Sequence, residues 1–127
     1  MEKHLFNAGD FQLHSGSVSQ FKIDCDALTG NDWQALAYLI SQRFQFKAVW
    51  GVPTGGTQLR RYLSLYCIDN DNLPTLIVDD VLTTGNSMEV AKASSIGGSV
   101  IGCVIFSRGK CPNWITPIFQ MWGNDAD

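Results

Sequence analysis

Short apolar runs alternate with amphipathic segments through the second half of the chain. Residues 48–52, 75–78 and 100–106 are the apolar runs, and each has the length of a buried strand. Residues 57–65 and 87–95 lie between them and have the spacing of helices. This alternation indicates βαβ units. We therefore predict an α/β fold of three layers, with a mostly parallel central sheet between helices.

The first half of the chain has a different pattern. Residues 11–24 are rich in Phe, Val, Ile and Ser and are interrupted at residues 15–17, which predicts two short extended segments around a turn. A helix is expected next, capped by Asn31 and ending near Phe44. Residues 112–122 interleave aromatic and aliphatic side chains with two prolines. We expect them to cover the core or to form an edge strand, with a dimer surface as the alternative.

Composition narrows the functional classes. A length of 127 residues fits a single domain, residues 1–127, and 9 basic against 12 acidic residues give a net charge of −3, which argues against a nucleic-acid partner. The apolar stretches are too short to cross a bilayer and residues 1–10 carry charges of both signs. We therefore expect no membrane partner and a cytoplasmic location. The four cysteines form no CxxC pair, which predicts reduced thiols and no zinc site.

Two adjacent carboxylates follow the run at residues 75–78. After Asp79 and Asp80 comes a loop of hydroxyl side chains that contains Gly85, and then a predicted helix. Backbone N–H groups at a helix start, together with hydroxyl donors, form an anion site that fits a phosphate monoester. Ionised carboxylates only accept hydrogen bonds, which suits a neighbouring diol or hydroxyls held through Mg²⁺.

Three segments of the chain carry a family resemblance. Residues 77–87 resemble the phosphoribosyl-pyrophosphate (PRPP) motif of the type I phosphoribosyltransferases, and residues 49–56 resemble the pyrophosphate loop of that family. Residues 11–19 resemble the N-terminal base-binding segment of the orotate phosphoribosyltransferases. The segments occur in the family's order and span most of the chain. The resemblance implies the type I phosphoribosyltransferase fold with a small N-terminal base-binding segment.

The resemblance also implies roles for individual residues. Two carboxylates would be catalytic, holding the ribose hydroxyls and, indirectly through those hydroxyls or water, the cofactor Mg²⁺: Asp79 and Asp80. The 5′-phosphate of PRPP would be held by Leu82, Thr83, Thr84, Gly85, Asn86 and Ser87, and its pyrophosphate by Thr54, Gly55 and Gly56. The base would be held by His14, Ser15, Gly16 and Phe21. Two arginines are candidate pyrophosphate contacts: Arg60 and Arg108.

The chain departs from the family's pattern in one place. The family has a long mobile loop, rich in Lys and Arg, that closes over the site. Here residues 69–74 form a short connector with two acidic residues and no basic one. The resemblance therefore implies a shortened form that lacks the mobile catalytic loop, and with it the exclusion of water and the stabilisation of the departing charge.

Two functions are compatible with these features. The first is a glycosyltransferase of pyrimidine biosynthesis, which transfers the 5-phosphoribosyl group of PRPP to a nucleobase, orotate first among the candidates, and releases pyrophosphate. The alternative is a non-catalytic module that binds PRPP or a nucleotide as a sensor. An unrelated nucleotide-binding domain lacks support, because the chain has neither a GxGxxG nor a GxxxxGK[ST] motif.

One structural alternative remains, and the resemblance has one implication for assembly. The carboxylates and the loop after them could form an ordinary strand, turn and helix start, in which Asn86 and Glu89 simply cap the helix. Relatives with this architecture are commonly dimers, so the resemblance also implies a homodimer.

Overall fold

The N-terminal part of the chain forms an antiparallel hairpin. The computed structural model describes residues 3–12, 18–95 and 98–121. The hairpin strands are β1 (Phe6–Gln12) and β2 (Val18–Ile23), and the ladder has an irregularity between Ala8 and Phe11. The two extended segments are thus confirmed, although the first begins five residues earlier than predicted. A short 3₁₀ turn, η1 (Cys25–Ala27), leads out of the hairpin.

Helix α1 (Gly30–Arg43) follows, and its start is fixed by a capping box. The backbone N–H of Thr29 donates to Oδ2 of Asp32 at 2.8 Å, and the N–H of Asp32 donates to Oγ1 of Thr29 at 3.2 Å. The predicted cap at Asn31 is therefore wrong. The Thr29 and Asp32 side chains satisfy two otherwise unpaired N–H groups reciprocally, which an asparagine inside the first turn could not do.

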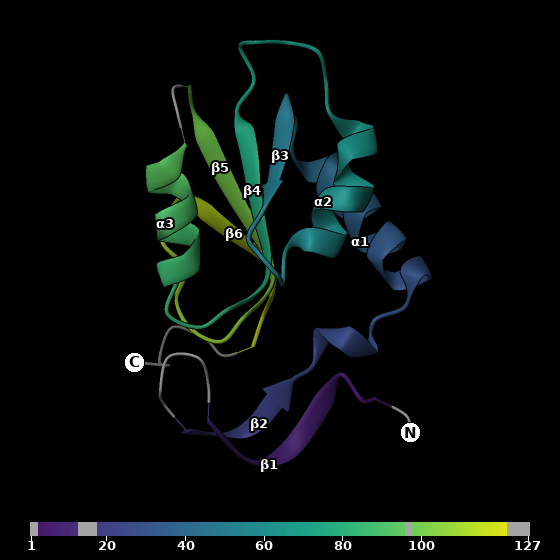
Figure 1. Cartoon of the computed structure of the whole chain (residues 1–127), viewed down its shortest axis with the longest axis vertical. Coiled ribbons are helices and arrows are strands. Elements are labelled where there is room, and N and C mark those ends of the chain that lie inside the picture. The colour runs from purple at the N-terminus through teal and green to yellow at the C-terminus, as the bar shows by residue number, and fades with distance from the viewer. Residues whose placement is uncertain (1–2, 13–17, 96–97, 122–127) are drawn as a thin grey trace.

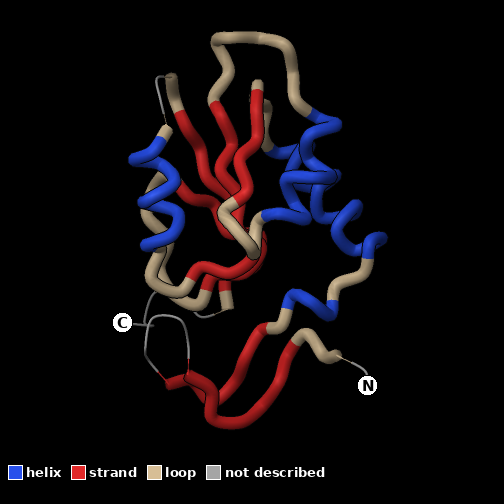
Figure 2. Tube along the Cα trace, viewed as in Figure 1, coloured by secondary structure: helices blue, strands red, loops and turns tan. Residues whose placement is uncertain are grey.

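The central sheet has four parallel strands in the order β3-β4-β5-β6. They are β3 (Ala48–Gly51), β4 (Thr75–Leu82), β5 (Val100–Ser107) and β6 (Ile115–Gln120). The helix between β3 and β4 is α2 (Thr57–Leu63), continued by η2 (Ser64–Tyr66), and α3 (Asn86–Ser94) lies between β4 and β5. Helices α1 and α2 lie on one side of the sheet and α3 on the other (Figures 1 and 2). The predicted three-layer α/β fold is confirmed.

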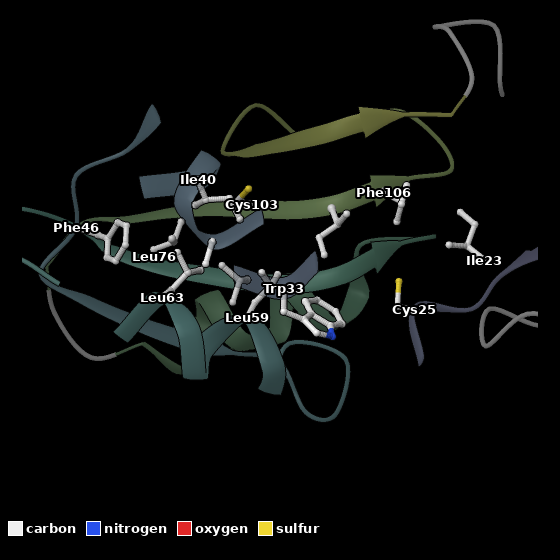
Figure 3. Packing of buried hydrophobic residues seen from close by; sticks show 13 residues of the cluster. Ile23, Cys25, Trp33, Ile40, Phe46, Leu59, Leu63, Leu76, Cys103 and Phe106 are labelled. Carbon is white, nitrogen blue, oxygen red and sulfur yellow. The ribbon is translucent and has the colours of Figure 1, made fainter. Parts of the chain in front are cut away.

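The two faces of the sheet bury different side chains. Toward α1 and α2, β4 places Leu76 and Val78 in a cluster that also holds Ile40 and Leu59 (Figure 3). Toward α3, the intervening Ile77 packs in a second cluster with Met88, Val52 and Val104. Strands buried on both faces read as continuous apolar runs, which is why residues 76–78 carry no polar position.

The C-terminal segment forms the edge strand that the sequence suggested. The chain leaves β5 at Ser107 and returns in seven residues to begin β6, which pairs in parallel with β5. The indole N–H of Trp114 on this return donates to Oε1 of Glu89 on α3 at 2.7 Å. The edge-strand prediction is confirmed for the described residues up to 121.

Among the described residues, no helix is long and apolar enough to cross a membrane, and all four cysteines are free thiols.

The hairpin lies beyond the carboxyl ends of the central strands (Figure 1). The N–H of Asp24 donates to the carbonyl of Leu5 at 2.6 Å, and the ring of Phe6 meets that of Phe106 edge-on at 5.9 Å. Figure 3 shows Ile23 and Cys25 at the end of the main core cluster, next to Phe106. The hairpin is therefore attached to the core at the edge of the sheet where parallel α/β folds bind ligands.

Candidate functional site

The two adjacent carboxylates lie inside β4. The strand continues through Leu82 and pairs with β5 at Asp79 and again at Val81. The prediction that the strand stops before Asp79 is therefore wrong, because ladder bonds to β5 hold the backbone extended. Asp79 is buried, with 8% of its surface exposed, and Asp80 is half-buried. The N–H of Asp80 donates to Oδ1 of Asp79 at 2.8 Å, and the N–H of Val81 donates to Oδ1 of Asp80 at 2.7 Å.

The electrostatics of this pair are unusual. Burial, followed by the repulsion of the neighbouring Asp80 carboxylate, raises the pKa of Asp79 to about 8. The Asp80 N–H bond acts in the opposite direction but does not offset burial. A carboxyl held in this way takes up a proton near neutrality. It gains stabilisation when a polar ligand supplies hydroxyl donors or positive charge, which favour the ionised form.

A loop that leads into α3 follows β4 directly, and we call residues 82–87 the phosphate cradle. Gly85 has a left-handed φ of +85° and forms the cap of α3, and no side chain caps that helix. The N–H of Asn86 lies 3.4 Å from Oγ1 of Thr84, at the limit of a hydrogen bond. The alternative in which Asn86 and Glu89 form a capping box is therefore wrong. Gly85 has no side chain to accept from the first N–H groups of α3, and the contact to Thr84 is long, which leaves these groups suited to an anion.

The loop also encloses a small polar cavity of about 30 Å³. Its lining joins the Asp79 carboxylate to the predicted phosphate loop: Asp79, Val81, Leu82, Thr83, Thr84, Gly85, Asn86, Ser87 and Met88. The structure thus brings together every residue predicted for the 5′-phosphate.

The predicted pyrophosphate loop, residues 53–56, lies against the same carboxylates. A Cβ placed on Gly55 would be 2.6 Å from Oδ1 of Asp79 and closer still to Oδ1 of Asp80, so only glycine fits there. Gly56 is packed as tightly on the backbone of Val52 and Val78, and its N–H donates to the carbonyl of Val52 at 2.7 Å. The peptide bond between Pro53 and Thr54 is cis. The two loops therefore flank one pair of carboxylates.

The predicted base-binding residues are only partly within the described chain. His14, Ser15 and Gly16 lie outside the described residues, and Phe21 belongs to β2, where it pairs with Ala8. Their contact with a base stays a prediction. The described hairpin lies at the carboxyl ends of the central strands (Figure 1), and Asp79 and Asp80 lie in the second half of β4.

One residue near the site was not anticipated from the sequence. Burial, followed by the negative charge of Asp80, raises the pKa of the Cys25 thiol to about 12, and Asp24, Asp26 and Asp79 contribute in the same direction. The thiol therefore stays protonated at neutral pH, and these charge effects show that the base of the hairpin lies near the carboxylates. A single cysteine in the sequence carries no signal from which this proximity could have been predicted.

The two candidate arginines occupy different places. The guanidinium of Arg60 lies 5.0 Å from the centre of the Trp50 ring, at the free edge of the sheet beside β3. Arg108 directly follows β5, and its N–H donates to the carbonyl of Leu82 at 3.0 Å, so it begins beside the phosphate cradle. Partial burial lowers the pKa of the Arg108 guanidinium. A role for either in holding pyrophosphate stays a prediction.

The short acidic connector lies at the opposite end of the sheet. The N–H of Ile68 donates to the carbonyl of Phe46, and the N–H of Lys47 donates to the carbonyl of Pro74, both at 2.9 Å. These bonds place residues 68–74 beside the amino ends of β3 and β4, whereas the carboxylates lie at the carboxyl end of β4 (Figure 1). The connector neither covers the site nor repels an anion bound there.

The carboxylate pair is a suitable partial site for Mg²⁺. Among the described residues no three His, Cys, Asp or Glu side chains form a metal-binding group. Mg²⁺ commonly retains waters and binds through one or two carboxylates together with substrate oxygens, so a pair of aspartates fits an ion that arrives with its substrate.

Comparisons with known proteins agree with this geometry. The chain is 29% identical over 133 residues to an orotate phosphoribosyltransferase of Pyrobaculum calidifontis, covering 81% of this chain and 69% of that protein. Its fold matches the crystal structure of orotate phosphoribosyltransferase from Aeropyrum pernix with a TM-score of 0.69 at 24% identity, over 92% of this chain and 89% of the other. The fold also matches the crystal structure of the Mycobacterium tuberculosis orotate phosphoribosyltransferase, with a TM-score of 0.66 at 14% identity, over 91% of this chain and 89% of the other. No family model matches the chain.

The fold and the two loops around the carboxylates resemble those of the type I phosphoribosyltransferase class. Within that class the chain resembles the orotate phosphoribosyltransferases, in sequence as well as in fold, as predicted. The same comparisons support an enzyme of the glycosyltransferase type.

Proposed function

We propose that this protein binds PRPP and transfers its 5-phosphoribosyl group to a nucleobase, with orotate as the preferred acceptor. The observation that carries this proposal is the placement of Asp79 and Asp80 between two glycine-containing loops. One loop lines a cavity with Asp79, and the other packs Gly55 against both carboxylates. The named relatives are orotate phosphoribosyltransferases, which supports orotate over other bases.

Each part of the site has a task in this reaction. The uncapped start of α3 and the hydroxyls of Thr83 and Thr84 hold the 5′-phosphate, and Asp79 and Asp80 accept hydrogen bonds from the ribose hydroxyls. The backbone of residues 54–56 faces the pyrophosphate. When bound with PRPP, Mg²⁺ would neutralise charge on the leaving pyrophosphate. The ribose is thereby fixed with its C1 exposed toward the hairpin, where the base would lie.

Transfer breaks the bond between C1 and the pyrophosphate oxygen and forms a bond between C1 and a ring nitrogen of the base. The bonding electrons leave with pyrophosphate, and the nitrogen of the base, ionised beforehand, supplies the new pair. Positive charge develops on the ribose as the leaving group departs. The carboxylates of Asp79 and Asp80 stabilise that charge best when both are ionised, and they lie in a partly buried site where such stabilisation is strong.

A second function, a PRPP or nucleotide sensor without transfer, is favoured by one observation. The connector at residues 68–74 lies at the far end of the sheet, so the described chain offers no basic loop over the carboxylates. In this alternative the lid has been lost, PRPP binds and pyrophosphate stays attached. Both functions require the same binding site, and we expect both to operate in the cytoplasm.

Calorimetric titration with PRPP and Mg²⁺ tests the binding site itself. We expect saturable heat in the wild-type protein and its loss in the Asp79→Asn, Asp80→Asn double variant. The Asp69→Asn, Asp71→Asn double variant is the matched control, because it removes two negative charges at the other end of the sheet. Absence of heat in the wild type, or equal heat in the site variant, would exclude both functions.

A further inference from the structure

A second, larger cavity lies on the face of the sheet that carries α3. It has a volume of about 770 Å³ and lies between α3 on one side and β3 with the start of the following loop on the other. We call it the β3–α3 groove, and its lining residues are Trp50, Val52, Pro53, Asn86, Ser87, Val90, Ala91, Ser94 and Ser95. A cavity of this size can hold a small organic molecule.

The two walls of the groove are apolar and differ in kind. Trp50 belongs to β3, the edge strand of the sheet, and 45% of its surface is exposed. Val90 of α3 is 66% exposed and forms part of the opposite wall, beside Ala91. An aromatic side chain binds a planar ring by stacking or by an edge-to-face contact. A flat apolar molecule therefore fits between an indole ring and the aliphatic side chains of a helix.

A cation lies beside the indole ring. The guanidinium of Arg60 is 5.0 Å from the centre of the Trp50 ring. Helix α2 passes close to β3, since a Cβ placed on Gly51 would be 3.0 Å from Cβ of Arg60. Because α2 and α3 lie on opposite sides of the sheet and β3 is its edge, the Arg60 side chain reaches around the free edge to a ring that lines the groove.

The Arg60 guanidinium is available for an anion. Within the part of the chain that the structure describes, Arg60 forms no ion pair. A guanidinium that lies over an aromatic ring keeps its N–H donors at its edge, and their fork matches the two oxygens of a carboxylate. The charged side chains of α3 are engaged elsewhere, because Glu89 accepts a hydrogen bond from the Trp114 indole and Lys92 lies 4.9 Å from the centre of that ring.

The charge around the groove indicates which ligand it takes. None of the lining residues is ionisable, and Arg60 supplies one positive charge beside them. One cation balances one carboxylate, whereas a phosphate monoester carries nearly two negative charges at neutral pH. We propose that the β3–α3 groove binds a planar aromatic carboxylate, whose ring lies against Trp50 and whose carboxylate pairs with Arg60.

This ligand site would border the candidate site without including its carboxylates. Pro53 belongs to the predicted pyrophosphate loop, and Asn86 and Ser87 belong to the phosphate cradle, so a ligand in the groove would contact both loops from outside. Asp79 and Asp80 are not among the lining residues. The proposal therefore does not depend on PRPP or on catalysis, and it is tested in the absence of PRPP.

Calorimetric titration with naphthalene-2-carboxylate tests the proposal. We expect one site per chain with a dissociation constant of about 100 µM. Two matched compounds separate the contribution of the ring from that of the charge. Naphthalene-2-carboxamide lacks the negative charge and cyclohexanecarboxylate lacks the planar ring, and each should bind at least about tenfold more weakly.

Two groove variants and two controls place the bound compound. Arg60→Gln removes the cation and Val90→Asp adds a carboxylate to the groove, so each should weaken binding at least about tenfold. Arg61→Gln is the matched control, because it removes the same charge from α2 where the guanidinium lies 5.7 Å from the centre of the Tyr62 ring, outside the groove. Binding should be unchanged in Arg61→Gln and in the Asp79→Asn, Asp80→Asn variant.

Circular dichroism of each variant establishes that the fold is intact. Absence of heat in the wild type would overturn the proposal, and so would equal binding of the carboxylate and the carboxamide. Equal losses in Arg60→Gln and Arg61→Gln would overturn it as well. Loss of binding in the Asp79→Asn, Asp80→Asn variant would also contradict it, since that result places the compound at the carboxylate pair. Because no titration contains PRPP, failure of the proposed function would leave these results unchanged.

Discussion

The backbone N–H of Asp80 donates a 2.8 Å hydrogen bond to Oδ1 of the side chain of Asp79, its own neighbour in β4. This bond holds the Asp79 carboxyl toward the following residue, and the carboxyl lines the cavity of the phosphate cradle while Gly55 of the other loop packs on the pair. The arrangement concentrates two carboxylates in a place where Asp79 is buried and Asp80 is half-buried. A ligand with hydroxyl groups or positive charge stabilises the ionised carboxylates and so offsets the electrostatic cost of their burial.

The raised pKa of Asp79 predicts how stability depends on pH. Its pKa is about 8 in the folded chain and near 3.8 in the unfolded chain, so between these values the folded state binds the extra proton. The free energy of unfolding should therefore fall as pH rises from about 4 to about 8. Asp79→Asn should stabilise the protein by on the order of 2 kcal/mol at pH 8 and much less at pH 4.5.

Urea unfolding at the two pH values measures this difference. Asp71→Asn, on the connector at the far end of the sheet, is the control for loss of one negative charge. Equal effects of Asp79→Asn at both pH values would show that the carboxyl ionises normally.

Replacement of Gly55 by alanine should selectively weaken the binding of PRPP. A Cβ at this position would overlap both carboxylates, so Gly55→Ala must displace either the loop or the aspartates. We expect the affinity for PRPP with Mg²⁺ to fall by about tenfold or more, as a displaced loop no longer faces the pyrophosphate. Gly109→Ala is the matched control, because a Cβ there meets no atom within 4 Å. Calorimetry that finds the two alanine variants equal would argue against this role of the loop.

Alanine substitutions at Gly85 and at Gly98 together distinguish the effect of backbone strain from the loss of phosphate binding. Gly85 and Gly98 both have positive φ, +85° and +76°, so alanine at either should cost about 1 kcal/mol of stability. Only Gly85 opens the phosphate cradle. We therefore expect Gly85→Ala to weaken binding of PRPP, measured by calorimetry, whereas Gly98→Ala leaves it unchanged. Weakened binding in both variants would mean that strain alone is responsible.

Arg108 should contribute to binding more than Arg61. The Arg108 backbone is hydrogen-bonded to Leu82 at the start of the cradle, while the Arg61 guanidinium lies over the Tyr62 ring at 5.7 Å on α2. Arg108→Gln should lower the affinity for PRPP by about tenfold, since a cation near a phosphate is lost, and Arg61→Gln should have little effect. The reverse order of effects would contradict the proximity of Arg108 to the ligand.

Much of this arrangement could be predicted from the sequence because it depends on local patterns. The apolar runs ending at Val52 and Val78 define β3 and β4, and the order of Asp79, Thr83 and Gly85 indicates a strand that leads into an anion loop. These features need only the period of the elements and the chemistry of neighbouring residues.

What could not be predicted depends on residues far apart in the chain. The extension of β4 through Asp79 to Leu82 follows from its pairing with β5, and the contact of Gly55 with both carboxylates follows from the turn after β3. The position of the acidic connector at the amino end of the sheet likewise requires the topology. For the same reason, the sequence gives no sign of the groove between β3 and α3, which arises from the sheet order.

The most direct test of the proposed function is the release of pyrophosphate when the protein is incubated with PRPP, Mg²⁺ and orotate. We predict that the wild type releases pyrophosphate and forms one nucleotide for each molecule released. The Asp79→Asn, Asp80→Asn variant should lose at least about a hundredfold in rate, and the Asp69→Asn, Asp71→Asn control should not. If PRPP binds by calorimetry but no pyrophosphate appears with orotate, uracil, hypoxanthine, guanine or adenine, phosphoribosyl transfer is contradicted and the sensor function stands in its place.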